Sequence, residues 1–246
     1  ATSVPHQTEV VSFMARATHA LVVADGDVEA SVLVELAADS PPPRLIAADG
    51  GAARVLAAGL VPDVVVGDFD SLGVAERARL DSLGVELRVA APDKDESDME
   101  LCLLTAIDDG VRSVTIVGAM GLLRPEHSVA NLLLLGDPRF DGLSVVIAGR
   151  GSRLWRIGTA DGPGAGSIEG EAGDFVSLFP LESAVEGVTT EGLRFPLADE
   201  MLPLGPSRGL SNELTTERAR VTSRRGRLLV IHTRRSSADA EPAGDH

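Results

Sequence analysis

The chain has 246 residues and a mass of 25.6 kDa, which is enough to bury a full core as one large α/β domain or as two smaller domains. Its 22 basic and 37 acidic residues give a net charge of -15, which opposes binding to nucleic acid or to an anionic membrane surface and implies that a polyanionic substrate is bound with metal. The single cysteine permits no intrachain disulfide, and no apolar run approaches the roughly 20 residues that span a bilayer, so we expect a soluble, cytoplasmic protein.

From His19 to about Ala148, short apolar and β-branched runs alternate with helical stretches. This pattern is typical of a parallel sheet that is covered on both faces. We expect its strands at residues 20–24, 45–48, 64–66, 85–89, 114–117 and 145–148. Several of these runs end in Asp or Gly, so their polar groups should collect at the carboxyl edge of the sheet, where open α/β sheets bind ligands.

Two acidic segments indicate a magnesium and polyphosphate site at this edge. Gly67-Asp68-Phe69-Asp70-Ser71 directly follows the expected strand 64–66, so Asp68 and Asp70 can project two carboxylates toward a hard cation. Asp93-Lys94-Asp95-Glu96-Ser97-Asp98 follows and could complete the ligand shell. Lys94 is the only lysine of the chain and places a positive charge where phosphate oxygens would need one.

An Asp-x-Asp pair after a strand is not unique to magnesium-dependent phosphate transfer. It also occurs in metal-dependent glycosyltransferases, in phosphatases whose first Asp is a nucleophile, and in simple polar turns. The phosphatase pattern continues with x-Thr and a separate downstream lysine, whereas here Ser71 follows at once and the lysine lies in the next acidic segment. The chain also lacks the Gly-x-x-x-x-Gly-Lys-Ser/Thr pattern, so phosphates are not expected to be held by a P-loop.

Asp49-Gly50-Gly51-Ala52 follows a strand and opens a helical segment. The backbone of Gly50 and Gly51 could approach a ligand closely while Asp49 points into the cleft, and a tight turn chosen for its geometry is the equal alternative. Further on, Ser97 and Glu100 have capping-box spacing, which places Asp98 in a first helical turn. Cys102 lies in the same helix, where we expect a buried structural thiol.

Arg124 and His127 precede another helical stretch. Arg124 is a candidate phosphate ligand, and His127 could orient a substrate, stabilise a developing charge, or simply cap the helix.

After Arg150 the sequence changes to glycine-rich turns between short alternating segments, with strands expected at residues 153–158, 175–179, 188–195 and 228–233. This predicts an α/β domain over residues 1–150, a smaller β-sandwich over 151–235 and a flexible tail over 236–246. We expect residues 162–166 to be a loop and the seven arginines from Arg218 to Arg235 to be the solvated face of the last hairpin.

These segments, in this order, resemble thiamine pyrophosphokinases. The resemblance lies in residues 48–52, Pro62-Asp63, residues 67–71, residues 93–98, Gly118-Ala119, residues 124–131, Thr190-Glu191-Gly192-Leu193 and Ser211-Asn212. It implies an α/β nucleotide-binding domain followed by a β-sandwich, in a homodimer. It also implies transfer of the pyrophosphoryl group of ATP to the hydroxyl of thiamine, which gives AMP and thiamine diphosphate.

The resemblance also implies roles for individual residues. Asp68, Asp70 and Asp98 would hold Mg²⁺ on the triphosphate, with Asp49 and Asp95 close by. Lys94 would contact phosphate, and Ser211 with Asn212 would line the thiamine pocket from across the dimer interface. Asp70 or Asp95 could accept the proton of the alcohol.

The loop before the helical stretch that follows Arg124 departs from the family pattern. Family members usually have Gly-Gly-Arg-x-Asp-His, whereas Gly121-Leu122-Leu123-Arg124-Pro125-Glu126-His127 has one more residue and Glu in place of Asp. Two alternatives therefore stay open: a related pyrophosphokinase that acts on another primary alcohol such as a hydroxymethylpterin, and a non-catalytic nucleotide-binding protein of the same fold.

Overall fold

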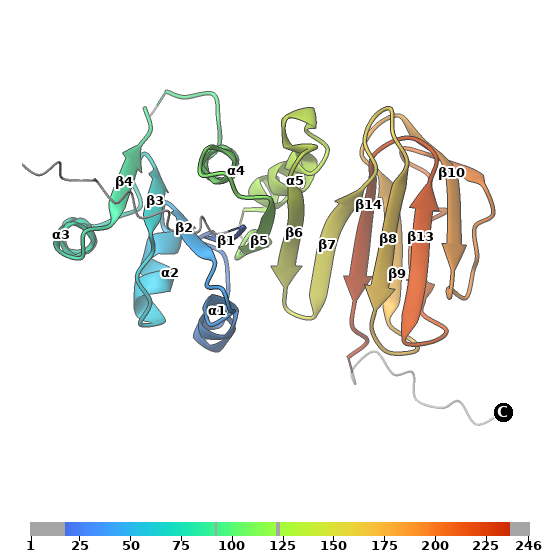
Figure 1. Ribbon diagram of the computed structural model, residues 1–246, viewed down its shortest axis with the longest axis horizontal. Helices are drawn as coiled ribbons and strands as arrows, with labels where there is room; N and C mark the ends of the chain where they lie inside the picture. Colours follow the sequence, from blue (N-terminus) through green and yellow to red (C-terminus); the bar gives the residue numbers. More distant parts are fainter. Residues whose placement is uncertain (1–17, 92, 122–123, 237–246) are drawn as a thin grey trace, which may run out of the picture.

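The computed structural model describes residues 18–91, 93–121 and 124–236, which form two regions joined by one long sheet (Figure 1). All but Ser236 of the expected tail, and Leu122 and Leu123 of the departing loop, lie outside the described residues.

The N-terminal region is an α/β unit in which β6, β5, β1, β2, β3 and β4 lie side by side in this order and run parallel. Its elements are β1 (His19–Val23), α1 (Ala30–Ala37), β2 (Arg44–Ala48), α2 (Gly51–Ala57), β3 (Val64–Gly67), α3 (Val74–Ser82), β4 (Glu86–Val89), α4 (Asp98–Asp108), β5 (Ser113–Val117), α5 (Pro125–Leu134), the 3-10 turn η1 (Pro138–Phe140) and β6 (Ser144–Gly149). The strands predicted for this region are confirmed, each with its ends within one residue of the prediction.

Both faces of the parallel sheet are buried at its inner strands, which explains why these are largely apolar, whereas the edge strand β4 has no buried residue and carries Glu86 and Arg88. In β1, Ala20 and Val22 contribute to a core that includes α4, whereas Leu21 and Val23 contribute to the core on the other face, with α1, α2 and α3. Successive side chains of a strand point to opposite faces, so each residue of this short strand is needed on one side or the other.

The chain reverses its direction of travel through the sheet beside β1, because β2 lies on one side of it and β5 on the other. The loops after β1 and β5 therefore touch: the N–H of Ala24 donates to the carbonyl of Val117 and that of Gly26 to the carbonyl of Gly118, both at 2.9 Å. A Cβ on Gly26 would lie 2.1 Å from the Gly118 oxygen, so this contact requires glycine. Such a switch point is where open α/β sheets bind ligands.

The C-terminal region is a β-sandwich. One of its layers continues the long sheet past β6 in the order β7, β14, β9, β12, with antiparallel pairing, and the other is a sheet of order β11, β10, β13, β8. Its strands are β7 (Ser152–Ile157), β8 (Gly164–Glu169), β9 (Phe175–Pro180), β10 (Ala184–Glu191), β11 (Glu200–Pro203), β12 (Asn212–Glu213), β13 (Arg218–Ser223) and β14 (Leu228–Thr233). Val176 and Val230 from one layer share a core with Val188 and Val221 from the other. The predicted fold class is confirmed.

Two strand predictions in this region need correction. Residues 162–166, expected to be a loop, contain the start of β8, which pairs with β13 from Gly164 onward. Its first residues are glycine and alanine, so the strand carries no apolar alternation in the sequence. The strand expected over 188–195 occupies Ala184–Glu191 instead, and Leu193 forms an isolated bridge with Leu214.

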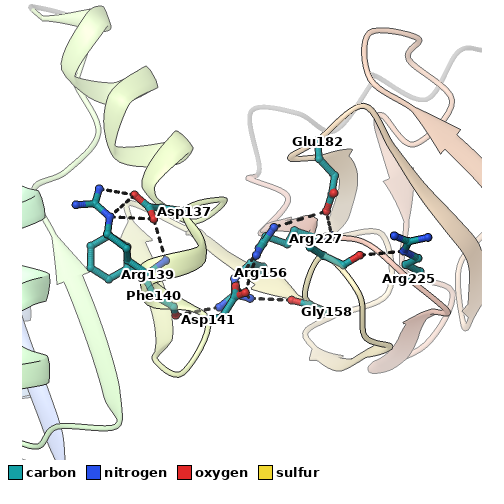
Figure 2. Close-up of polar contacts among 10 residues, drawn as sticks. Asp137, Arg139, Phe140, Asp141, Arg156, Gly158, Glu182, Arg225 and Arg227 are labelled. Atoms are coloured by element: carbon teal, nitrogen blue, oxygen red, sulfur yellow. Dashed lines mark hydrogen bonds and ion pairs between the residues drawn. The ribbon is translucent and has the colours of Figure 1, made fainter.

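Six of the seven late arginines are exposed as predicted, but the prediction is wrong in two respects. β13 and β14 are not a hairpin, because they lie in different layers of the sandwich. In addition, Arg227 is buried and pairs with Asp141, which follows η1, while its backbone N–H donates to a carboxylate oxygen of Glu182 at 2.7 Å (Figure 2). Arg156 of β7 binds the same aspartate at 2.9 Å, so the charges tie the sandwich to the α/β region.

No helix within residues 18–91, 93–121 and 124–236 is long and apolar enough to cross a membrane.

Candidate active site

The carboxyl ends of β2 and β3 bring two acidic segments together. The two strands are neighbours, with Ala48 opposite Val66, and the N–H of Asp49 donates to the carbonyl of Val66 at 2.9 Å. A Cβ on Gly67 would lie 3.0 Å from the Cβ of Asp49. Glycine at this position therefore lets Asp49 lie against the turn that begins at Asp68.

Asp49, Asp68 and Asp70 each offer a carboxylate oxygen, and these oxygens lie within 4.8 Å of one another. Asp49 is only 7% exposed, and its Oδ1 atom has no hydrogen-bond partner within the part of the chain that the structure describes. Asp68 is half-buried and Asp70 is exposed. Because oxygen atoms at such spacing are the ligands that hard divalent cations prefer, the three residues fit a metal ion, with Asp49 as the deepest donor.

Burial raises the pKa of the Asp49 carboxyl, because loss of water disfavours the charged form. The nearby hydroxyl of Ser71 acts in the opposite direction, and the charges of Asp98, Asp70 and Asp68 raise the pKa again. A divalent cation bound among these groups would relieve the repulsion that disfavours the ionised form of Asp49.

Local hydrogen bonds shape the turn after β3. The N–H of Asp70 donates to Oδ1 of Asp68 at 3.2 Å, and Oγ of Ser71 donates to Oδ1 of Asp70 at 3.0 Å. Between the two aspartates, Phe69 has a φ of +62° and a side chain that is only 3% exposed. The buried ring thus anchors a turn whose two carboxylates stay outside the core.

The second acidic segment leads into α4. Ser97 caps this helix as predicted, since its Oγ accepts the N–H of Glu100 at 3.2 Å. The Glu100 carboxylate pairs with Arg139 at 2.7 Å, so the cap is one-sided. In the first turn of the helix Asp98 forms an ion pair with Lys94, which compensates its charge.

Asp98 borders the group of three carboxylates. A Cβ on Gly67 would lie 3.3 Å from Oδ1 of Asp98, so the same glycine separates this residue from Asp49. The mutually close carboxylates found among the described residues are nevertheless those of Asp49, Asp68 and Asp70, and Asp98 as a metal ligand stays a prediction. Asp49, which the sequence placed only close by, lies within the group.

Two other residues of this segment were singled out from the sequence. Asp95 is exposed on the loop before α4, and its role as a base stays a prediction. Cys102 is fully buried within α4, and burial raises the pKa of its thiol, so the prediction of a buried structural cysteine is confirmed.

Gly50 and Gly51 lie against the loop after β1. A Cβ on Gly50 would be 2.8 Å from Cγ of Asp25, and one on Gly51 would be 2.1 Å from the carbonyl oxygen of Val23. Arg54 closes the same contact by donating to the carbonyl of Asp25 at 2.8 Å. Close packing against the backbone is therefore enough to require Gly51, whereas the exposed Asp25 side chain beside Gly50 could move aside, and contact of either glycine with a ligand stays a prediction.

Arg124 and His127 lie at the start of α5, beyond the carboxyl end of β5 and thus at the same edge of the sheet as the acidic group. Both are exposed and both approach Glu126: the Arg124 guanidinium forms an ion pair with it, and Nε2 of His127 lies 4.0 Å away. The glutamate that replaces the family's aspartate is therefore the residue that brings the two predicted side chains together.

Ser211 and Asn212 lie far from the acidic group within one chain, because β12 is at the opposite end of the long sheet from β2 and β3. Seven strand spacings, from the first to the eighth position, separate β12 from β2, or roughly 34 Å at about 4.8 Å each. The Asn212 carboxamide accepts the N–H of Phe195 at 2.9 Å and donates to its carbonyl at 2.7 Å. This buried amide therefore holds the Phe195 segment, whereas Ser211 is exposed.

One residue of the site was missed from the sequence. Arg77 of α3 donates to the carbonyl of Phe69, and its guanidinium lies over the Phe69 ring with 5.3 Å from Cζ to the ring centroid. Its one signal in the sequence is an arginine in the helix that follows the acidic turn. Whether such an arginine folds back onto the turn depends on the angle between helix and strand, which no spacing gives.

The fold and the acidic group define a class of protein: an α/β unit with a carboxylate site for a cation at its ligand-binding edge, joined to a β-sandwich. Comparisons with known proteins narrow this class. Residues 41–147 match the family model for the thiamin pyrophosphokinase catalytic domain, and residues 167–228 match the model for the thiamin pyrophosphokinase vitamin B1 binding domain. The chain belongs to the thiamine pyrophosphokinase family.

Individual relatives agree with this assignment. A thiamine pyrophosphokinase of Bacillus subtilis is 27% identical over 189 residues, which are 76% of this chain and 86% of the relative. A solved structure of a thiamin pyrophosphokinase family protein from Enterococcus faecalis is 26% identical, with a TM-score of 0.72, and the match covers 89% of this chain and 100% of that one. The structure of the Bacillus subtilis thiamine pyrophosphokinase has a TM-score of 0.76 at 24% identity, with 89% and 100% covered, and supports the fold.

Proposed function

We propose that the protein is a thiamine diphosphokinase, which transfers the pyrophosphoryl group of ATP to the hydroxyl of thiamine and releases AMP. The observation that carries this proposal is the group of three carboxylates at the carboxyl edge of the sheet, with one buried oxygen that no described residue satisfies. Family membership supports thiamine as the acceptor, and the acidic edge supports a donor that arrives with a cation.

Asp49, Asp68 and Asp70 would hold Mg²⁺, and Asp98 at their border is a further candidate ligand. When bound, the ion would neutralise charge on the phosphate oxygens of ATP and so reduce their repulsion by the acidic edge. The distinction between Mg²⁺ and Mn²⁺ rests on supply in the cell, because the same oxygen donors suit both ions.

The nucleotide would lie across the switch point between the loops after β1 and β5. Gly50 and Gly51 are beside this point, and Arg124 with His127 follows β5 at the same edge. Lys94 is 14% exposed in its side chain and is paired with Asp98, so a phosphate that displaced the carboxylate would find the lysine in place. A fixed positive charge of this kind suits a triphosphate.

Thiamine would bind between two copies of the chain. Ser211 and Asn212 are about 34 Å from the acidic edge along the sheet, too far to serve it within one chain. A homodimer in which the sandwich of one copy meets the acidic edge of the other would complete the site. This proposal joins the vitamin B1 binding match over residues 167–228 to the catalytic match over 41–147.

The chemistry would require positioning more than covalent help from the protein. The thiamine hydroxyl oxygen attacks the β-phosphorus, a new O–P bond forms, and the bond from the β-phosphorus to the bridging oxygen of AMP breaks. A carboxylate accepts the hydroxyl proton, and Asp70 and Asp95 are the exposed acids proposed for this step. We place the reaction in the cytoplasm, on the sequence argument alone.

The first experiment is a product analysis with purified protein, ATP, Mg²⁺ and thiamine. We expect AMP and thiamine diphosphate in equal amounts, and no product when EDTA removes the metal. Release of ADP would overturn pyrophosphoryl transfer in favour of a simple kinase. A panel of primary alcohols that includes a hydroxymethylpterin tests the acceptor, and preference for the pterin would overturn thiamine; the comparisons do not favour that alternative or a non-catalytic protein.

A complementation experiment tests the shared site. Asp68→Asn disables the acidic edge and Ser211→Trp fills the opposite half-site, so each variant alone should be inactive. Mixed dimers carry one site with both changes and one with neither. Random mixing makes half of the dimers mixed, so about a quarter of wild-type activity should return. If no activity returns although mixed dimers form, the site lies within one chain.

A further inference from the structure

We propose that Arg77 is a positioning residue for the cation site, and that it holds the turn between Asp68 and Asp70 in the geometry that brings their carboxylates together. The proposal deepens the function proposed above and rests on it. Arg77 lies in α3, the helix that follows the turn, and contacts the residue between the two aspartates through both its backbone and its ring.

The turn has a backbone conformation that needs support. Phe69 has a φ of +62°, a value that residues with bulky side chains adopt rarely because of crowding between the side chain and the backbone. The Phe69 ring is buried in the core with α2 and α3. The strained residue is therefore fixed from below by the core, and its carbonyl, which accepts the N–H of Leu72 only at 3.4 Å, has room for a closer donor as a second partner.

Arg77 supplies that partner from above. Its Nη2 atom donates to the Phe69 carbonyl and lies 3.5 Å from the carbonyl oxygen of Asp68, while its Cζ atom is 5.3 Å from the centroid of the Phe69 ring. The Arg77 guanidinium thus contacts the carbonyl groups of two successive residues, Asp68 and Phe69, and also the face of the Phe69 ring.

These contacts of Arg77 affect the distance between the carboxylates of Asp68 and Asp70. In an extended strand, residues two apart point to the same face but lie about 6.6 Å from each other along the chain, which is farther than the separation of the two carboxylates here. The left-handed residue closes the turn, and oxygens of Asp68 and Asp70 lie within 4.8 Å of each other and of Asp49. Loss of the Arg77 contacts should let the turn relax and the two carboxylates move apart.

Arg77 also leaves both carboxylates free. Its hydrogen bonds go to backbone carbonyls, whereas Lys94 is bonded to the carboxylate of Asp98. A cation bound by Asp68 and Asp70 therefore does not have to displace this arginine. Supporting residues behind metal ligands typically affect affinity by 10- to 100-fold, and an exposed residue such as Arg77 should lie at the lower end.

The test is a direct measurement of Mn²⁺ binding, in which electron paramagnetic resonance detects the free ion. It needs neither nucleotide nor turnover. We expect Arg77→Met to bind Mn²⁺ about 10-fold more weakly than wild type, and Arg77→Lys, which keeps charge and a donor, to recover part of the loss. Arg79→Met is the matched control: Arg79 is exposed on the same helix and has no side-chain hydrogen bond or ion pair within residues 18–91, 93–121 and 124–236. Its affinity should equal that of wild type.

Steady-state kinetics add a readout that general damage would not give. The Mg²⁺ concentration for half-maximal rate should rise about 10-fold in Arg77→Met, while the KM for thiamine stays within twofold of wild type. Equal Mn²⁺ affinity of Arg77→Met and wild type overturns the proposal, and so does a wild-type protein that binds no Mn²⁺. A wild type that binds Mn²⁺ but makes no thiamine diphosphate overturns the proposed function instead, and the role of Arg77 is then decided by the binding data.

Discussion

Two aspartates of this molecule, Asp141 and Asp49, lie in opposite electrostatic environments. Asp141 is held by Arg156 and Arg227, with contacts of 2.9 Å to each, and the hydrogen bond from Arg227 lowers the pKa of its carboxyl despite partial burial (Figure 2). Asp49 faces three other carboxylates, and burial together with their charge raises its pKa. The first arrangement is complete in itself, whereas at Asp49 the charged form is disfavoured until a cation binds beside it.

This difference in charge environment indicates different roles for the two sites. The Asp141 site, which we call the junction, comprises Asp141, Arg156, Arg227 and Glu182, and it connects the residue after η1 with the turns and strands of the sandwich (Figure 2). The acidic edge, comprising Asp49, Asp68 and Asp70, connects no two regions. We therefore expect changes at the junction to affect stability and changes at the acidic edge to affect activity.

Turnover should respond most strongly to the loss of an oxygen donor at the acidic edge. Asp70→Asn removes one charged oxygen donor from the acidic edge, and the rate should fall by about 100- to 1000-fold, as it does when a group that stabilises charge in a transition state is lost. Because Asp70 is exposed, the free energy of unfolding should change by less than about 0.5 kcal/mol. The measurements are kcat and urea unfolding, with Asp81→Asn on the exposed surface of α3 as the control. A variant within threefold of wild-type rate would remove the acidic edge from the reaction.

The next effect, on stability, belongs to the junction. The side chain of Arg227 is 9% exposed. Arg227→Met leaves Asp141 paired with Arg156 alone and removes the guanidinium that lies 4.0 Å from the carboxylate of Glu182. Breaking a buried ion pair in this way typically costs about 3 kcal/mol. Urea unfolding followed by the fluorescence of Trp155, which is the only tryptophan and lies on β7, measures the loss. Wild-type stability in Arg227→Met would mean that the main-chain pairing of the sheet alone holds the two regions together.

The junction also predicts a dependence on pH. The carboxyl of Asp141 has a lowered pKa in the folded protein, so its contribution is present above the unfolded pKa, about 3.9, and is lost as the pH falls through the lower folded pKa. The stability difference between wild type and Asp141→Asn should therefore be constant near neutral pH and shrink below about pH 4. Urea unfolding at a series of pH values measures this difference. A difference that is the same at pH 3 and pH 7 would mean that charge is not what Asp141 contributes.

Much of the fold followed from the sequence because the physics is local. A strand buried on both faces must be apolar throughout, so residues 64–66 identified β3, and Asp68 and Asp70 followed directly from their place after it. The inclusion of Asp49 in the acidic group depends on the pairing of β2 with β3 and on the missing side chain of Gly67, which are tertiary facts.

What the sequence could not provide were contacts between distant segments. Arg227 looked like one more surface arginine, because its partner Asp141 is 86 residues away. The start of β8 looked like a loop, because Gly164 and its neighbours carry no apolar side chains and the pairing with β13 is made by backbone alone. Arg77 is only eight residues from Phe69, but its partner is a carbonyl group and not a side chain of opposite charge, so nothing in the sequence indicated the contact.

Mg²⁺ alone should distinguish the acidic edge from the junction, although its effect on stability is small. Mg²⁺ at ten times its dissociation constant should stabilise the wild type by about 1.4 kcal/mol, visible as a rise in Tm, since it binds only the folded protein. Asp49→Asn should abolish this rise, because it replaces the deepest oxygen donor with a neutral amide, and without metal it should be at least as stable as wild type because an unpaired buried charge is gone. Asp141→Asn should unfold more readily and yet keep the full response to Mg²⁺. If Mg²⁺ stabilises Asp49→Asn as much as wild type, the cation binds elsewhere and the unsatisfied oxygen of Asp49 is not a metal ligand.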